Sequence, residues 1–577
     1  MPAIDPVLKQ GRQPVVVAPF EPGRTDSPTA GGDRVTQAHN MTDYETTYAE
    51  FRPAVPEYFN FAGDVVDKWA QDRAKLAILW VDDAGNEVRK TFWDLVQSSK
   101  KLANVLTASG VRRDDVILVV LPRDIAWWET LTAGIRMGAL LAPSPTQLSA
   151  KDLAFRANTS QAVCLITNHD IAAQFEQVQD QCPTVKTKIV VSGPRKGWIF
   201  YDQALAATPA QFETVKTRSS DNCLVYFTSG TAGTPKMALH THASYPIGHQ
   251  VTGRFWLDLR PADLHWNVGD TGWAKAAWSS YFGPWHCGAA LFVHHSEHFD
   301  PVKTLELLQR HPVTTLCGTP TLYRMLILHY RSASKFPALR HCVAAGEPLG
   351  AEIIEVWKRA TGITIRDGYG QTETVLLAGS FPCLAPRFGS MGKPAPGIEL
   401  GVIGGDGALL PANTEGDIAV RVEPTRPVGL FKEYWQAPES TAAVFRNGWY
   451  LTGDRGYVDE DGYFWFVGRS DDVILSSGYR IGPFEVESAL GEHPAVAEAA
   501  VVSSPDQTRG EVVKAFIVLA PGFAPSNGLV KELQQHVKKV CAPYKYPRKI
   551  AFVDALPKTV SGKIRRGELR NTEWGIA

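Results

Sequence analysis

Short apolar runs alternate with amphipathic stretches between about Phe61 and Leu409. The apolar runs predict buried strands at Val116–Leu121, Ala162–Thr167, Ile189–Val191, Leu224–Phe227, Ala289–His294 and Cys342–Ala345. Ile125–Ile135 is a predicted helix, because Pro122 ends the first run and an amphipathic stretch follows. Apolar strands separated by helices are typical of βαβ units and largely parallel sheets, so we expect an α/β fold. Ligands bind beyond the carboxyl ends of such strands, and the loop after Phe227 lies at such an end.

The pattern changes near Glu460. Asp461–Gly462 is a hairpin-turn signal before a strand candidate at Tyr463–Val467. Later strand candidates are Ala499–Val502, Val513–Leu519 and Lys549–Val553, and one helical face is formed by Leu529, Val530, Leu533, Val537 and Val540. These elements predict a small α+β unit of roughly one hundred residues, which is an ordinary size for a domain.

Length and composition are those of an ordinary globular protein. The 577 residues are too many for one hydrophobic core, so at least two domains are expected. A formal net charge of -1 gives no reason to expect a nucleic acid or an anionic membrane as partner. No apolar stretch is long enough to span a bilayer. The eight cysteines include no C-x-x-C pair, which indicates neither a zinc site nor a disulfide framework and favours a reducing compartment.

The first forty residues are rich in Pro, Gly and polar groups, as in a disordered tail. A transit peptide is usually poor in acidic residues, and this segment contains Asp5, Glu21, Asp26 and Asp33. We therefore expect a cytoplasmic protein, with the mitochondrial matrix as the alternative. The expected state is a monomer or small homo-oligomer.

Residues Thr228–Lys236 read TSGTAGTPK and follow an apolar strand. Glycines let backbone N–H groups approach an anion closely, hydroxyls add donors, and Lys236 adds a charge-assisted contact. The segment therefore predicts a phosphate-binding loop, and a plain surface loop is the alternative if it is considered alone. A Walker A loop is disfavoured because it needs Gly directly before Lys, where this chain has Pro235.

Five later segments carry further candidate chemistry: DGYGQTE at Asp367–Glu373, YLTGD at Tyr450–Asp454, GRSDD at Gly468–Asp472, SSGYRIG at Ser476–Gly482 and LPKTVSGK at Leu556–Lys563. Tyr369 offers a flat ring to a purine, Glu373 offers a carboxylate to a hard cation, and Asp454 offers two oxygens to two hydroxyl donors. Any one segment alone is also compatible with an ordinary cap, turn or solvated charge.

In this order the segments resemble those of the adenylate-forming superfamily, which includes acyl-CoA synthetases, the adenylation domains of peptide synthetases and firefly luciferases. The Gly that usually follows the signature Lys is Met237 here, a departure that medium-chain acyl-CoA synthetases share. The resemblance covers nearly everything after Met41 and implies the superfamily's fold. We therefore expect a disordered tail at residues 1–40, a large AMP-binding domain at 41–469, and a small mobile domain at 470–577 with its hinge near Asp471.

The resemblance implies a ligase that uses ATP, releases AMP, and joins a carboxylic acid to coenzyme A through an acyl-adenylate. Lys563, Thr228 and Glu373 would be catalytic, and Thr228 and Glu373 would hold Mg²⁺. The implied ATP contacts are Thr228, Ser229, Gly230, Thr231, Gly233, Thr234, Lys236, Asp367, Gly368, Tyr369, Gly370, Gln371, Thr372, Asp454, Arg469 and Lys563. The implied coenzyme A contacts are Ser477, Gly478, Tyr479, Arg480, Arg509, Lys538, Tyr544 and Tyr546.

The candidate acyl pocket consists of Trp273, Lys275, Gly346 and Gly370. Acetyl-CoA synthetases carry a Trp at the position of Gly370 that shortens their pocket, so an acid longer than acetate is expected here. Lys275 stands where an apolar residue is expected. If its side chain faces the pocket, it would favour a substrate with a second polar group; if it faces outward, it would have no bearing on the substrate.

A medium-chain fatty acid is the first expectation for the substrate, and an aryl acid such as benzoate is the alternative. Two other readings are an adenylating enzyme that loads a carrier-protein thiol and a non-catalytic binding protein. A non-catalytic binding protein should have lost Lys563 or Glu373, and this chain keeps both residues.

Overall fold

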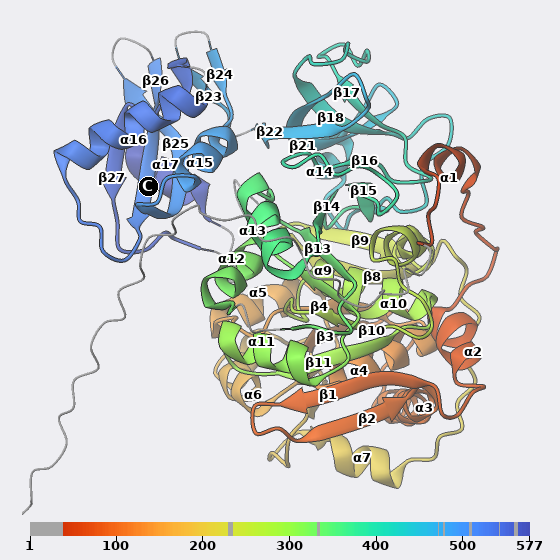
Figure 1. Ribbon diagram of the computed structural model, residues 1–577. Helices are drawn as coiled ribbons and strands as arrows, with labels where there is room; N and C mark the ends of the chain where they lie inside the picture. Colours follow the sequence, from red (N-terminus) through yellow and green to blue (C-terminus); the bar gives the residue numbers. More distant parts are fainter. Residues whose placement is uncertain are drawn as a thin grey trace, which may run out of the picture. The chain divides into compact units, whose positions relative to one another are not determined.

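The computed structural model describes residues 39–228, 235–331, 335–470, 472–476, 479–506, 510–541, 543–558 and 564–576, with backbone alone for 479, 480 and 543. Its strands form four sheets, labelled in Figure 1. No helix within these residues is both long enough and apolar enough to cross a membrane. All eight cysteines are free.

The first sheet has nine strands, and its centre is parallel. Antiparallel pairing is confined to the edge strands β2, β15 and β16. In spatial order the strands are β16 (Lys393–Pro394), β15 (Leu376–Gly379), β14 (Ile365–Gly370), β13 (His341–Ala345), β12 (Thr315–Gly318), β10 (Leu264–Asn267), β11 (Ala290–His295), β1 (Leu76–Asp82) and β2 (Glu87–Thr91).

The second sheet has eight strands and is parallel from β8 to β7. Its order is β19 (Glu433–Tyr434), β9 (Met237–Thr241), β8 (Asn222–Phe227), β4 (Leu140–Pro143), β3 (Val116–Val120), β5 (Cys164–Thr167), β6 (Thr187–Val190) and β7 (Ile199–Phe200). The β8–β9 hairpin is antiparallel, and it carries the candidate phosphate loop at its tip.

Two five-stranded sheets complete the architecture. The third sheet is antiparallel and contains β17 (Leu400–Ile403), β18 (Gly416–Arg421), β21 (Trp449–Val458), β20 (Phe445–Arg446) and β22 (Phe464–Arg469). The fourth contains β24 (Tyr479–Ile481), β23 (Ile474–Ser476), β26 (Gly510–Leu519), β25 (Val496–Asp506) and β27 (Lys549–Phe552). Only β26 and β27 pair in parallel in this last sheet.

Helices cover the sheets and close separate apolar cores. The helices are α1 (Tyr44–Glu50), α2 (Asp67–Trp69), α3 (Phe92–Ala108), α4 (Ile125–Met137), α5 (Ala150–Ser160), α6 (His169–Glu176), α7 (Tyr201–Ala207), α8 (His249–Val251), α9 (Ala274–Ala277), α10 (Gly283–His286), α11 (Pro301–Arg310), α12 (Pro320–His329), α13 (Ala351–Thr361), α14 (Pro438–Ala443), α15 (Pro483–Gly491), α16 (Asn527–Val540) and α17 (Arg566–Trp574). Apolar side chains of α11, α12 and α13 pack on the nine-stranded sheet, and those of α5 and α6 pack on the eight-stranded one.

The predicted α/β fold is confirmed, and the predicted apolar runs correspond to β3, β5, β6, β8, β11 and β13. The predicted helix is α4, which begins where Asp124 accepts a hydrogen bond from the Ala126 N–H and ends at Gly138 with φ 72°. All of its residues except Ile125 are buried, including the charged side chains of Glu129 and Arg136. Of the antiparallel third sheet, only one strand was predicted: Tyr463–Val467 corresponds to β22. The sequence pattern groups it with the small α+β unit, but β22 pairs with β21 and so belongs to the third sheet.

Candidate active site

The base of the candidate phosphate loop is held by the β8–β9 hairpin. The Thr228 N–H donates to the Lys236 carbonyl over 2.7 Å, directly after the paired residues Phe227 and Met237. The predicted contacts Ser229, Gly230, Thr231, Gly233 and Thr234 lie outside the described residues. The Lys236 ammonium lies 4.9 Å from the centre of the Tyr434 ring, a cation–π contact. The Lys236 ammonium therefore places a positive charge at the end of the candidate phosphate loop.

Three predicted residues donate hydrogen bonds to the Asp454 carboxylate, which is buried with 4% of its surface exposed. The Tyr369 hydroxyl and the Gln371 amide donate to Oδ2 over 2.6 and 2.7 Å. Arg469, paired with Asp454 across β21 and β22, donates to Oδ1 over 3.0 Å. A carboxylate can accept about four hydrogen bonds, so this buried anion has capacity beyond these three donors.

Gly368 is a glycine because an indole occupies the space beside it. A Cβ at position 368 would lie 2.3 Å from the Trp256 ring, which leaves no room for a side chain. The same indole donates from Nε1 to the Asp367 carbonyl over 3.0 Å. Trp256 was not predicted from the sequence, and it fixes the strand β14 that presents Tyr369 and Gly370.

The Thr372 carbonyl accepts two hydrogen bonds that sequence reasoning missed. His240 Nε2 donates over 2.8 Å, and the Tyr245 hydroxyl donates to the same oxygen. Burial lowers the pKa of His240 to about 3, so its ring is neutral, with the proton on Nε2. Nδ1 can then accept from the Ser244 hydroxyl, 3.0 Å away. These two side chains hold the segment that carries Thr372 and Glu373.

Glu373 is a half-buried carboxylate with few compensating partners. Its Oε1 accepts from the Tyr434 hydroxyl over 2.8 Å, and burial raises its pKa above the usual value. The described residues contain no ion pair to Glu373. Because Tyr434 contacts both Lys236 and Glu373, it links the end of the phosphate loop to the candidate metal ligand.

Asp367 has a perturbed carboxyl group next to this site. Burial raises its pKa to about 8, and the Gly368 N–H and the charge of Lys275 oppose that shift only in part. In the unfolded chain this carboxyl has an ordinary pKa near 3.8, so the stabilising effect of its protonated form is lost progressively as the pH rises from there through about 8.

We expect Asp367→Asn to remove this pH dependence, because an amide cannot ionise. The melting temperature of the variant relative to the native chain should rise steadily as the pH increases from 5 to about 8 and then level off. Thermal unfolding across that pH range measures the difference. A difference that is constant with pH would contradict the assignment of Asp367 as the titrating group.

Lys275 faces the protein interior. Its ammonium donates to the Gly318 carbonyl over 2.6 Å and to the Ala345 carbonyl over 2.9 Å, at the carboxyl ends of β12 and β13. Burial lowers its pKa. The outward-facing alternative is therefore wrong, and the side chain ties α9 to two parallel strands.

The other predicted acyl-pocket residues lie around the same strand ends. Trp273 precedes α9, and its indole N–H is buried without a described partner. Gly346 follows β13 with φ 102°, in the left-handed region that glycine adopts easily. A Cβ at Gly370 would lie 2.4 Å from the indole of Trp278, a residue that the sequence analysis did not single out.

The candidate coenzyme A residues are described only in part. Ser477, Gly478 and Arg509 lie outside the described residues, and Tyr479 and Arg480 are described by their backbone in β24. Lys538 on α16 lies 4.1 Å from the centre of the Tyr546 ring. Arg548 also lies over that ring, at 4.8 Å, and donates to its hydroxyl over 2.6 Å. Two cations around one half-buried aromatic ring would suit a phosphorylated nucleotide.

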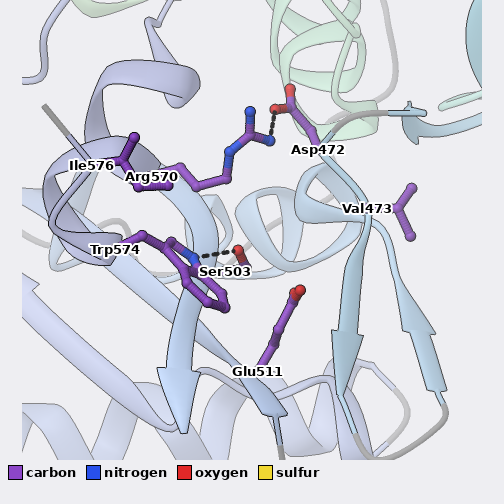
Figure 2. A pocket seen from close by; sticks show the side chains of 7 residues that line it. All are labelled: Asp472, Val473, Ser503, Glu511, Arg570, Trp574 and Ile576. Carbon is purple, nitrogen blue, oxygen red and sulfur yellow. Dashed lines mark hydrogen bonds and ion pairs between the residues drawn. The ribbon is translucent and has the colours of Figure 1, made fainter.

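Lys563 and Asp471 also lie outside the described residues. A backbone bridge joins Lys558 to Ile564, on the two sides of the segment that contains Lys563. The helix α17 follows, and Arg570 of this helix forms an ion pair of 3.2 Å with Asp472 (Figure 2). The helix that follows the catalytic-lysine segment is thus bonded to the residue next to the predicted hinge.

Figure 2 shows the cavity between α17 and the strands of the fourth sheet. Its volume is about 270 Å³, and Trp574 closes one side by donating from its indole to Ser503 over 3.0 Å. It contains none of the residues predicted to bind substrate.

Comparison with known proteins identifies two family models in the chain. Residues 66–435 match the AMP-binding enzyme model, and residues 485–563 match the AMP-binding enzyme C-terminal domain. The chain is 50% identical over 551 residues to acyl-coenzyme A synthetase ACSM3, mitochondrial, of Rattus norvegicus, which covers 94% of this chain and 95% of the relative. It is 48% identical over 553 residues to the Homo sapiens protein of the same name, with 94% of each chain covered.

Among solved structures, the anthranilate CoA ligase AuaEII in complex with anthranoyl-AMP matches with a TM-score of 0.83. The sequences are 30% identical, and the match covers 90% of this chain and 98% of that one. The chain is thus similar to these ligases over nearly its whole length, and residues of separate strands converge on Asp454 in its candidate site. The chain belongs to the AMP-binding enzyme family and is an AMP-forming acyl-coenzyme A ligase.

Proposed function

We propose that this ligase activates a medium-chain fatty acid and that the residues around Asp454, Thr372 and Glu373 form its ATP site. The convergence of Tyr369, Gln371 and Arg469 on the buried Asp454 carboxylate carries the proposal. In this arrangement the aromatic face of Tyr369 receives adenine and Asp454 receives the ribose hydroxyls. Medium chain length is supported by Met237 and by the similarity to the curated relatives.

In the first step the substrate carboxylate attacks the α-phosphorus of ATP, pyrophosphate leaves, and an acyl-adenylate remains. Two anions must approach each other, so the site acts mainly by neutralising charge and fixing geometry. Thr228–Lys236 holds the departing pyrophosphate, and Lys563 neutralises charge at the α-phosphate. The bonds from His240 and Tyr245 to the Thr372 carbonyl support this role by fixing the segment beside the phosphate.

Mg²⁺ fits the chemistry of Glu373. Magnesium is usually held by one or two carboxylates together with substrate phosphates rather than by an all-protein cage. The described residues contain no cluster of three potential metal ligands, whereas Glu373 is a half-buried carboxylate that accepts a hydrogen bond from the neutral Tyr434 hydroxyl. Glu373 and Thr228 would hold the ion, which supplies positive charge at the phosphates when bound.

In the second step the thiol of coenzyme A attacks the acyl carbon, and AMP leaves. We assign residues 41–469 to the large domain, residues 470–577 to the small one, and Asp471 to the hinge between them. Rotation about the hinge would replace Lys563 at the site with Ser477–Arg480. Lys538, Tyr546 and Arg509 would then contact the nucleotide part of coenzyme A. The cations around Tyr546 support that assignment.

We expect Asp454→Asn to raise the KM for ATP by about ten- to a hundred-fold, because hydrogen bonds to a charged group are lost and Arg469 loses its counter-ion. The KM for the acid should change little. Acid-dependent pyrophosphate exchange measures both constants. Asp417→Asn is a matched control in the same sheet, where it removes a 3.1 Å ion pair to Arg455. Equal rises in the KM for ATP and the KM for the acid would argue against a contact between Asp454 and the ribose.

The substrate proposal is tested by AMP release with coenzyme A across acetate, butanoate, hexanoate, octanoate, decanoate and benzoate. A maximum among the aliphatic acids longer than acetate supports it. Preference for benzoate would favour the aryl-acid alternative, which the similarity to an anthranilate CoA ligase supports. Turnover with a carrier-protein thiol in place of coenzyme A would instead favour an adenylating enzyme that loads a carrier protein.

The location printed for the curated relatives supports the mitochondrial matrix rather than the cytoplasm for this chain. Fractionation of the source cells tests this assignment: recovery with soluble matrix markers supports it, and recovery with cytosolic markers contradicts it.

A further inference from the structure

The indole of Trp278 fills the space into which a side chain at position 370 would project. Trp278 begins the short π-helix η4 (Trp278–Phe282) directly after α9 and is buried, with 5% exposed. A Cβ at Gly370 would lie 2.4 Å from the Cη2 atom of this indole and 2.5 Å from the Val375 carbonyl oxygen. The absence of a side chain at position 370 therefore does not leave that space open.

Several contacts hold the Trp278 indole in place. Its Nε1 donates to the Tyr245 hydroxyl over 3.3 Å, and its ring lies 5.3 Å from the ring of His249. One turn earlier, Lys275 ties α9 to the ends of β12 and β13 through two carbonyls. A side chain anchored in this way in a close-packed region resists displacement, so an extended ligand would meet a fixed wall.

The same indole is connected to the α-phosphate segment. Trp278 donates to the Tyr245 oxygen, and Tyr245 donates in turn to the Thr372 carbonyl. Tyr245 is fully buried, so both hydrogen bonds are shielded from water. Trp278 and the Thr372 carbonyl thus share the Tyr245 hydroxyl as a hydrogen-bond partner, while close packing around the indole also holds the wall in place.

We infer that Trp278 is a specificity-determining residue that closes the far end of the acyl pocket. It limits unbranched substrates to the short end of the medium-chain range, with butanoate and hexanoate preferred to octanoate and decanoate. The inference rests on the proposed function, because it takes the space beside Gly370 to be the acyl pocket. Lys275 acts through Trp278 as a positioning residue rather than by binding a second polar group of the substrate.

The test compares Trp278→Leu with the native chain by measuring kcat/KM for AMP formation with each aliphatic acid. Each methylene accommodated in an apolar pocket is worth about a factor of ten or more, so the ratio of decanoate to butanoate should rise at least about tenfold. Trp278→Met is the second variant if Trp278→Leu fails to fold. The control is Trp93→Leu on α3, which removes an indole that lies under Arg73. It should leave the ratio of decanoate to butanoate unchanged.

Tyr245→Phe separates the wall from the hydrogen-bond connection. It keeps the ring but removes the hydroxyl, so the chain-length ratio should stay the same while the KM for ATP in pyrophosphate exchange rises several-fold. A native chain that prefers decanoate, or an active folded Trp278 variant with an unchanged ratio, overturns the inference and leaves the ligase function intact. No turnover of any acid by the native chain would instead refute the proposed function.

Discussion

Replacing Lys563 with alanine should slow acyl-adenylate formation by about a hundred- to a thousand-fold and spare thioester formation from supplied acyl-adenylate. The physical reason is that the first step brings a carboxylate against a triphosphate, and one well-placed positive charge at the site of developing charge is worth about this factor. The second step starts from a mixed anhydride and a thiol, and does not require that charge. Pyrophosphate exchange measures the first step, and AMP release from synthetic acyl-adenylate with coenzyme A measures the second.

Lys558→Ala is the matched control for this prediction. Lys558 belongs to the same segment, but its ammonium bonds Glu498 over 2.6 Å, so its loss should reduce neither step by more than a few-fold. Equal loss of both half-reactions in Lys563→Ala would contradict the division of labour between Lys563 and Ser477–Arg480.

Glu373→Gln should reduce acyl-adenylate formation by about a hundred-fold or more, because the amide cannot supply the negative charge that a hard divalent cation requires. The variant should also need a higher concentration of Mg²⁺ for half-maximal rate. Calorimetric titration of ATP into the protein with and without Mg²⁺ gives a second readout, since the gain in ATP affinity from Mg²⁺ should shrink.

Glu399→Gln is a suitable control, because Glu399 is an exposed carboxylate paired with Arg421 over 3.1 Å. Tyr434→Phe removes only the hydroxyl that Glu373 accepts from, and should have a smaller effect than Glu373→Gln. An unchanged Mg²⁺ requirement in Glu373→Gln would count against Glu373 as a metal ligand.

The parallel strands could be predicted from the sequence because helices and neighbouring strands bury them on both faces. Every residue of β3, β5 and β13 is buried, so each of these strands is a continuous apolar run. Most of the third sheet was missed because its longest strand, β21, alternates between buried and half-buried residues and therefore does not form an apolar run. The Gly-rich and acidic segments could be proposed as site residues from the sequence because their residue types suit phosphate, ribose and metal chemistry.

The supporting residues could not be found because their partners lie far away in the sequence. His240 and Thr372 are 132 residues apart, and a histidine at the end of an apolar strand gives no signal of what it will bond. Gly370 by itself indicates an open space, whereas the space beside it is filled by Trp278 of a different element. Lys275 was recognised as unusual, but only the fold decides between its two orientations.

The transfer of oxygen from the acid to AMP tests the central claim, that the carboxylate attacks the α-phosphorus of ATP. A carboxylic acid labelled with oxygen-18 on both carboxyl oxygens is converted with ATP and coenzyme A, and the products are examined by mass spectrometry. Attack by the carboxylate predicts one labelled oxygen in each AMP and none in pyrophosphate, because the oxygen bridging the acyl carbon and phosphorus leaves with AMP. Unlabelled AMP, or label in inorganic phosphate with ADP as product, would contradict it.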